Sequence, residues 1–249
     1  MKVDFYYWSY QCPLNNSMMK LLKEYEDKLH INYHDISENF ELAQRMNMFF
    51  PTLTVVNDTY RFFSPIRRSF LNSLYKGEIP IEKPYLPKLG RVAKEYTIKP
   101  ITKEICCIAC SCTGEDNLED CNKKLQFYEN QKLSVFGYIN IDSNNKLLGG
   151  VEYLPSLMVP YKIPKDSETV FLTCVYLSDS DYDYKSGPLR ALENHLNSHF
   201  NKVFVISDEI GVFPNGDLKF FLENGYEDLG VISKEKDYCT LHLMCKNLD

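Results

Sequence analysis

An uninterrupted apolar run covers residues 170–177, whose sequence is VFLTCVYL. Runs of β-branched and aromatic residues without alternation are typical of strands that are buried on both faces. Leucine and phenylalanine then recur at helical spacing from residue 189 to residue 200, which predicts an amphipathic helix that begins at Gly187 and Pro188. The pattern predicts a buried strand followed directly by a helix, and the start of such a helix gathers amides that suit phosphate oxygens.

Two further elements follow in the same stretch. A second buried strand is predicted at residues 203–206. After a turn at residues 214–216, apolar positions 218, 221 and 222 predict one face of a short helix, which Gly225 can end in the left-handed conformation. The resulting order of strand, turn, helix, strand and helix indicates an α/β (α+β) fold in this part of the chain.

The first 75 residues show a different succession of patterns. Strands are predicted at residues 3–7, 31–35, 53–56 and 60–63, and helices at residues 18–29, 40–46 and 70–75. This order resembles the thioredoxin-like fold. The resemblance places Cys12 near the start of the first helix, where a helix dipole favours a thiolate, and Pro51 where that family carries a cis-proline. Asn15 stands at the position of the resolving cysteine.

A proline-containing segment separates this part from the rest. Residues 79–88 carry Pro80, Pro84 and Pro87 among charged residues, a composition typical of a semi-rigid linker. We therefore expect a thioredoxin-like domain at residues 1–78, a linker at residues 79–88 and a second domain at residues 89–249.

The second domain resembles the GNAT superfamily of acyl-CoA-dependent N-acetyltransferases. Its element order is similar, and the segments EICCIA (104–109), NKK (122–124) and GGVEYLP (149–155) resemble the YoaP-type branch. The resemblance implies a mixed sheet flanked by helices. It also implies an enzyme that transfers an acetyl group from acetyl-CoA to an amine of an unidentified small molecule or protein.

The pyrophosphate-binding turn of that superfamily reads Q/R-x-x-G-x-G/A. Gly187 matches its first glycine, whereas Tyr184 and Leu189 depart from the pattern. Phe221 stands where many members place a tyrosine that protonates the leaving thiolate. The acetyl-CoA-binding residues implied by the resemblance are Cys174, Val175, Tyr176 and Leu177 on the strand and Lys185, Ser186, Gly187, Pro188, Leu189 and Arg190 at the turn.

Attack by a neutral amine on a thioester requires an acceptor for the amine proton. Glu152 is the leading candidate, because it lies in an otherwise apolar predicted strand, where partial burial raises the pKa of a carboxyl. A carboxylate paired with a lysine or a backbone amide is the alternative. Glu168, Asp208 and Glu209 are weaker candidates near strand ends.

Two groups of residues resemble metal ligands. Cys106, Cys107, Cys110, Cys112 and Cys121 include a C-x-x-C pair, but Ile105, Ile108 and Ala109 predict a buried strand over the same segment. His195 and His199 lie four residues apart on the predicted helix, without a nearby glutamate or third ligand. No metal site is therefore predicted.

Composition narrows the classes of function. The net charge of −6 opposes a general nucleic-acid binder, and the chain begins without a charged and apolar leader, so a cytoplasmic protein is expected. Its nine cysteines fit reduced, partly buried thiols. The expected partners are acetyl-CoA and an amine acceptor, and the sequence is also compatible with a homodimer. The alternatives are a non-catalytic acyl-CoA sensor and a monothiol oxidoreductase acting through Cys12.

Overall fold

The computed structural model describes residues 1–113, 118–177 and 181–248. The chain divides into two compact units. Unit 1 consists of Met1–Lys83 with the later segments Glu119–Phe127 and Pro160–Lys162, and unit 2 contains the remainder from Pro84 onward. The boundary between Lys83 and Pro84 falls inside the segment that the sequence predicts as a linker. Among the described residues, no helix is both long enough and apolar enough to cross a membrane.

Unit 1 is built around a four-stranded sheet with the strand order β2-β1-β3-β4. β1 pairs parallel with β2 and antiparallel with β3, and β3 pairs antiparallel with β4. The elements are β1 (Lys2–Tyr7), α1 (Leu14–Lys23), β2 (His30–Asp35), α2 (Phe40–Arg45), β3 (Thr52–Val56), β4 (Tyr60–Phe62) and α3 (Arg68–Tyr75). The predicted element order is confirmed. Alternation of buried Val3 and Phe5 along β1 supplies the sheet side of the core, against Leu22 of α1 and Leu71 of α3.

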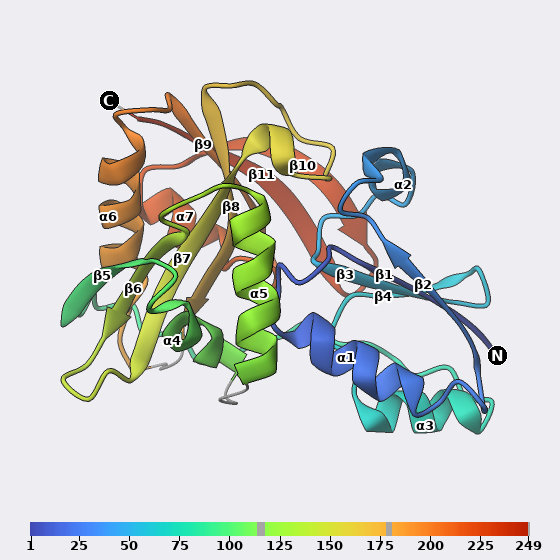
Figure 1. Cartoon of the computed structure of the whole chain (residues 1–249). Coiled ribbons are helices and arrows are strands. Elements are labelled where there is room, and N and C mark those ends of the chain that lie inside the picture. The colour runs from blue at the N-terminus through green and yellow to red at the C-terminus, as the bar shows by residue number, and fades with distance from the viewer. Residues whose placement is uncertain (114–117, 178–180, 249) are drawn as a thin grey trace. The chain divides into compact units, whose positions relative to one another are not determined.

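Unit 2 contains a seven-stranded mixed sheet with the order β10-β11-β9-β8-β7-β6-β5 (Figure 1). Its strands are β5 (Thr97–Ile101), β6 (Gly137–Ile141), β7 (Leu147–Pro155), β8 (Thr169–Leu177), β9 (Lys202–Asp208), β10 (Glu227–Glu235) and β11 (Cys239–Asn247). Its helices are α4 (Cys106–Cys110), α6 (Ser186–Leu196) and α7 (Leu218–Glu223), while α5 (Leu118–Asn130) contributes residues to both units. The predicted order β8, α6, β9, α7 is confirmed.

One face of this sheet carries a hydrophobic core. Val151 and Tyr153 of β7 and Leu172 of β8 are buried together with Leu189, Leu192 and Leu196, which form the predicted stripe along α6. Burying aliphatic side chains of this size stabilises the fold by about 1.5–3 kcal/mol each. Phe220 and Phe221 of α7 close the same cluster. This packing holds α6 against the face of the sheet that β5, β6 and β7 form.

Three local predictions were wrong. The segment Cys106–Cys110 forms α4 rather than a strand, because short apolar runs carry too little periodicity to separate helix from strand. Leu222 is 49% exposed, and the buried positions of α7 are Phe220 and Phe221, since six residues define the phase of a helix poorly. Among the described residues, the cis peptide bond precedes Pro214, so the bond before Pro51 is trans.

The cysteines also differ in part from the expectation. Seven carry no disulfide, whereas Cys107 and Cys121 are disulfide-bonded and are not thiolates available to a metal. Disulfide formation depends on distances that only the folded chain defines. His199 lies beyond the end of α6 at Leu196, so the two histidines do not share one helix.

Candidate functional site

The two central strands of unit 2 separate toward their carboxyl ends. β8 and β9 are parallel, but their pairing covers only Thr169–Phe171 on β8 and Lys202–Phe204 on β9. β8 continues to Leu177 and β9 to Asp208 without pairing with each other. Open α/β sheets bind ligands beyond the carboxyl ends of parallel strands. The separated halves of β8 and β9 therefore define a candidate site.

The predicted strand residues of the site lie in this separated half. Cys174, Val175, Tyr176 and Leu177 all belong to β8, where they pair with residues 149–152 of β7. Val175 is buried in the core, and the other three are half-buried. The structure thus brings these four residues to the end of β8 that leads toward α6.

The start of α6 is already bound by a carboxylate of the chain. Asp183 Oδ1 accepts hydrogen bonds from the amides of Lys185 at 2.9 Å and Ser186 at 3.3 Å, and Asp183 Oδ2 accepts one from the Ser186 hydroxyl. A carboxylate at this position satisfies both the amides and the helix dipole. Two of the amides that the sequence predicts as phosphate donors therefore already donate to Asp183.

The remaining predicted turn residues are mostly covered. Gly187, Pro188 and Leu189 are buried in the first turns of α6. Arg190 is exposed, and its guanidinium forms an ion pair with Glu95. These contacts involve a segment just after the predicted linker, and no sequence pattern pointed to it.

We call residues 89–95 the strap. The Lys94 amide donates to the Asp183 carbonyl at 2.9 Å, and the Asp183 amide donates to the Val92 carbonyl at 2.9 Å. Arg91 of the strap donates from both terminal nitrogens to Asp217 Oδ1 at 3.0 Å. The strap thus contacts the residues just before α6 and the first residue before α7.

A polar pocket lies beside the strap. Its volume is about 220 Å³, and its lining includes Arg91, Lys185, Arg190 and Glu223. Lys185 is only 5% exposed, and its Nζ lies 3.8 Å from the centre of the Phe220 ring. Within the described part of the chain, no acceptor lies within hydrogen-bonding distance of this ammonium. A buried cation without such a partner destabilises the fold and is well suited to receive an anion.

Burial lowers the pKa of Lys185, although Asp183 and Asp217 oppose that shift. In the unfolded chain the lysine keeps its ordinary pKa of 10.5, so at a pH between the lowered pKa and 10.5 the unfolded chain binds a proton that the folded chain has released. The contribution of Lys185 to the free energy of unfolding should therefore increase as the pH rises through the lowered pKa toward 10.5. A Lys185→Met variant should lack this increase and should be as stable as the wild type at pH 7, or more stable by up to about 2 kcal/mol.

Urea unfolding followed by circular dichroism between pH 7 and pH 10 measures both quantities. Lys219→Met is the matched control, because this lysine is exposed on α7 and forms its ion pair with Glu223 of the same helix. Equal pH profiles for Lys185→Met and the wild type would contradict a lowered pKa of Lys185 in the folded chain.

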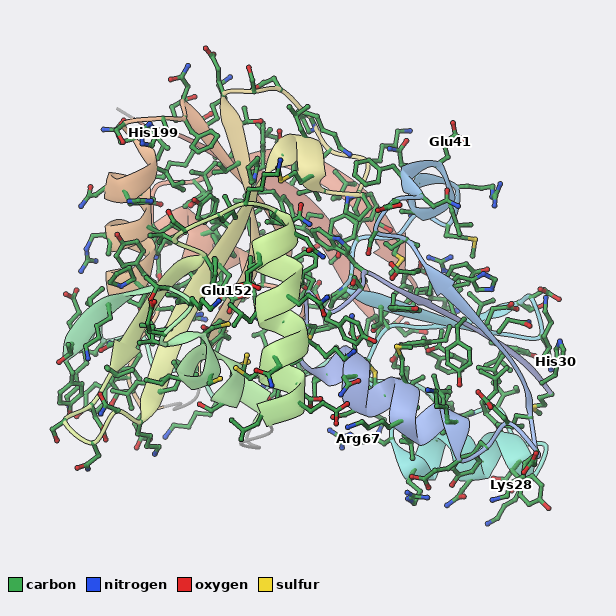
Figure 2. All side chains as sticks on the ribbon, in the orientation of Figure 1. Lys28, His30, Glu41, Arg67, Glu152 and His199 are labelled. Carbon is green, nitrogen blue, oxygen red and sulfur yellow. The ribbon has the colours of Figure 1, made fainter. Side chains whose placement is uncertain are left out.

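Glu152 occupies a different environment from the one expected. Its side chain is fully rather than partly buried, and its Oε2 accepts a hydrogen bond from the Tyr128 hydroxyl at 2.5 Å. Val151 and Tyr153, the flanking residues of β7, belong to the core beneath α6, so the Glu152 carboxylate faces the other side of the sheet. Figure 2 shows Glu152 surrounded by side chains at the middle of β7. The geometry favours the structural alternative.

Other polar candidates also have structural partners. Asp208 is 2% exposed and accepts hydrogen bonds from the amides of Ile210, Gly211 and Thr240. Desolvation raises the pKa of its carboxyl, and these amides oppose that shift. Phe221 is fully buried between the rings of Phe220 and Tyr226, at centroid distances of 5.1 and 5.3 Å. Among the described residues, His195 and His199 belong to no cluster of closely spaced metal ligands.

Comparisons with known proteins give matches among solved structures only. No protein-family model matches the chain, and no curated protein matches it. YncA from Salmonella typhimurium, described as an acetyltransferase and solved with acetyl-CoA, has a TM-score of 0.47 at 14% identity, covering 61% of this chain and 94% of its own. An acetyltransferase of the GNAT family from Desulfovibrio desulfuricans has a TM-score of 0.44 at 10% identity, covering 61% and 99%. The ribosomal-protein-alanine N-acetyltransferase from Brucella melitensis has a TM-score of 0.45 at 14% identity, covering 61% and 100%.

Proposed function

We propose that unit 2 is an N-acetyltransferase of the GNAT type that transfers an acetyl group from acetyl-CoA to an amine. The observation that carries this proposal is the separation of β8 from β9 beyond Phe171, with α6 starting nine residues after the end of β8 at Leu177. Such a separation leaves room for an extended acyl chain beside a strand. The resemblance of the turn around Gly187 to the pyrophosphate-binding motif supports the same ligand.

In the proposed reaction, the amine nitrogen attacks the thioester carbonyl carbon while both substrates are bound. A C–N bond forms, the C–S bond breaks, and the thiolate of CoA leaves. Backbone groups of residues 174–177 would align the pantetheine arm and polarise the carbonyl, and residues 185–190 would bind the diphosphate. The burial of Glu152 removes it as the leading base, so the amine proton would pass to water.

The residues that line the pocket include positively charged side chains, which suit an anionic ligand. Arg91, Lys185 and Arg190 line one pocket, and their charges oppose those of a diphosphate. Some of these donors already have partners within the chain. Arg91 pairs with Asp217, Arg190 pairs with Glu95, and the amide at the start of α6 donates to Asp183. The positive charge of the site therefore suits the diphosphate of acetyl-CoA. Access of acetyl-CoA to these donors would depend on the strap.

The test is to combine calorimetry of acetyl-CoA binding with mass spectrometry of acetylated products from a panel of small amines and amine-bearing peptides. Saturable binding with an acetylated product would support the enzyme. Saturable binding without product from any amine would favour the sensor alternative. Absence of binding, both in the wild type and in variants that remove the ion pairs of the strap, would exclude the enzyme and the sensor.

We further propose that unit 1 is a thioredoxin-like module that retains the fold without redox work. The strand order β2-β1-β3-β4 and the place of Cys12 two residues before α1 support this proposal. Asn15 is fully buried, and its amide donates to the Ser9 carbonyl at 2.6 Å, so this position serves packing. Glutathione-dependent reductase activity that disappears in a Cys12→Ser variant would contradict the proposal.

A further inference from the structure

The strap packs through its backbone against the residues just before α6 and through a side chain against α6 itself. A Cβ atom added at Gly90 would lie 2.3 Å from the backbone nitrogen of Tyr182, so only glycine allows this close approach. A Cβ atom added at Gly187 would lie 2.7 Å from Glu95 Cγ. The glycine that matches the diphosphate-binding motif thus faces a side chain of the strap.

Charged side chains hold the two ends of the strap. Arg91 pairs with Asp217 at 3.0 Å, and Glu95 pairs with Arg190. Both pairs are solvent-exposed on at least one side, with Arg91 at 42% and Arg190 at 54% side-chain exposure. Exposed ion pairs shift an equilibrium by about fivefold or less each, so breaking these contacts costs little free energy.

The strap lies over cationic groups that are well suited to bind an anion. Lys185 points into the pocket as a buried ammonium without a hydrogen-bond acceptor among the described residues. The pocket volume of about 220 Å³ is smaller than the roughly 300–1,000 Å³ of ordinary ligand sites. With the strap in this position, the pocket is too small to enclose a nucleotide-sized ligand.

We propose that residues 89–95 form a gate over the donor site, which covers the start of α6 when closed and frees Gly187, Lys185 and Arg190 when open. This inference rests on the proposed function, because acetyl-CoA is the ligand that the gate would admit. Donor binding and strap closure compete for the same surface. The measured affinity for acetyl-CoA therefore contains the equilibrium constant for opening.

The first test removes the two acidic partners in the ion pairs that hold the gate. Glu95→Gln breaks the pair with Arg190, and Asp217→Asn breaks the pair with Arg91 while an asparagine still caps α7. Each variant should lower the Kd for acetyl-CoA by about two- to fivefold in calorimetry. Glu223→Gln is the matched control, because it removes a carboxylate from the same pocket and leaves the strap untouched.

The second test follows the strap itself. The amides of Lys94 and Asp183 form the two hydrogen bonds that join the strap to the segment before α6. Hydrogen exchange at these two amides therefore reports whether the strap is closed. Saturating acetyl-CoA should accelerate exchange at both amides, while exchange within β11 should stay unchanged.

The outcomes separate the gate from the proposed function. Binding with faster exchange supports the gate, as does binding that appears only in Glu95→Gln or Asp217→Asn. Binding with unchanged or slower exchange overturns the gate and leaves the transferase standing. An equal gain in Glu223→Gln also overturns it, since charge alone would explain the affinity. Absence of binding in the wild type and in both opening variants overturns the gate and the transferase together.

Discussion

Replacing Gly187 by tryptophan should weaken acetyl-CoA binding by at least about 100-fold, which corresponds to about 2.7 kcal/mol. Gly187 lies in the first turn of α6, where even a Cβ atom would approach Glu95 Cγ to 2.7 Å. An indole ring would fill the space that the diphosphate needs, whether the strap is closed or displaced. Calorimetry with acetyl-CoA measures the loss.

The matched control for this variant is Asn194→Trp. Asn194 lies on the exposed face of the same helix, two turns away from the site, so a tryptophan there tests the effect of the side chain alone. Both variants should retain the circular dichroism spectrum of the wild type. Unchanged affinity in a folded Gly187→Trp protein would place the donor elsewhere on the chain.

The Phe221→Ala variant should lose about 3–5 kcal/mol of unfolding free energy. Phe221 is fully buried, and its ring packs edge-on against Phe220 and Tyr226, so truncation leaves a cavity in the core shared by α6 and α7. The chain has one tryptophan, Trp8, which belongs to unit 1, so unfolding of unit 2 is best followed by circular dichroism in urea.

A Phe221→Tyr variant tests the role of the same position in catalysis. Adding a hydroxyl in the fully buried aromatic cluster should cost about 1–3 kcal/mol, because the group loses its hydrogen bonds to water. It should not increase the rate of acetyl transfer, since the ring faces the core. A faster reaction in this variant would show that the position reaches the leaving thiolate after all.

The elements around the candidate site were readable from the sequence because their patterns are local. The run at residues 170–177 and the leucine stripe on α6 each specify burial through their own spacing, and β8 and α6 follow those predictions closely. Gly225, with φ of 82°, ends α7 as its position in the sequence suggested.

The parts that escaped prediction depend on contacts between distant residues. The strap precedes α6 by about ninety residues and has the polar, irregular composition of a linker, so only the folded chain reveals that Glu95 meets Gly187. The cap of α6 by Asp183 was within reach of the sequence, because an aspartate just before a predicted helix is a common capping residue. The environment of the Glu152 side chain also depends on a distant residue, because its hydrogen-bond partner Tyr128 belongs to α5.

The strap is joined covalently to the surface that it covers. A free inhibitor loses its effect on dilution, but a tethered competitor has an effective concentration that the length of the chain sets. The fraction of molecules open to acetyl-CoA would then be the same in a dilute solution and in a crowded one. Only changes that act on the strap or its ion pairs, such as a shift in ionic strength, would alter that fraction.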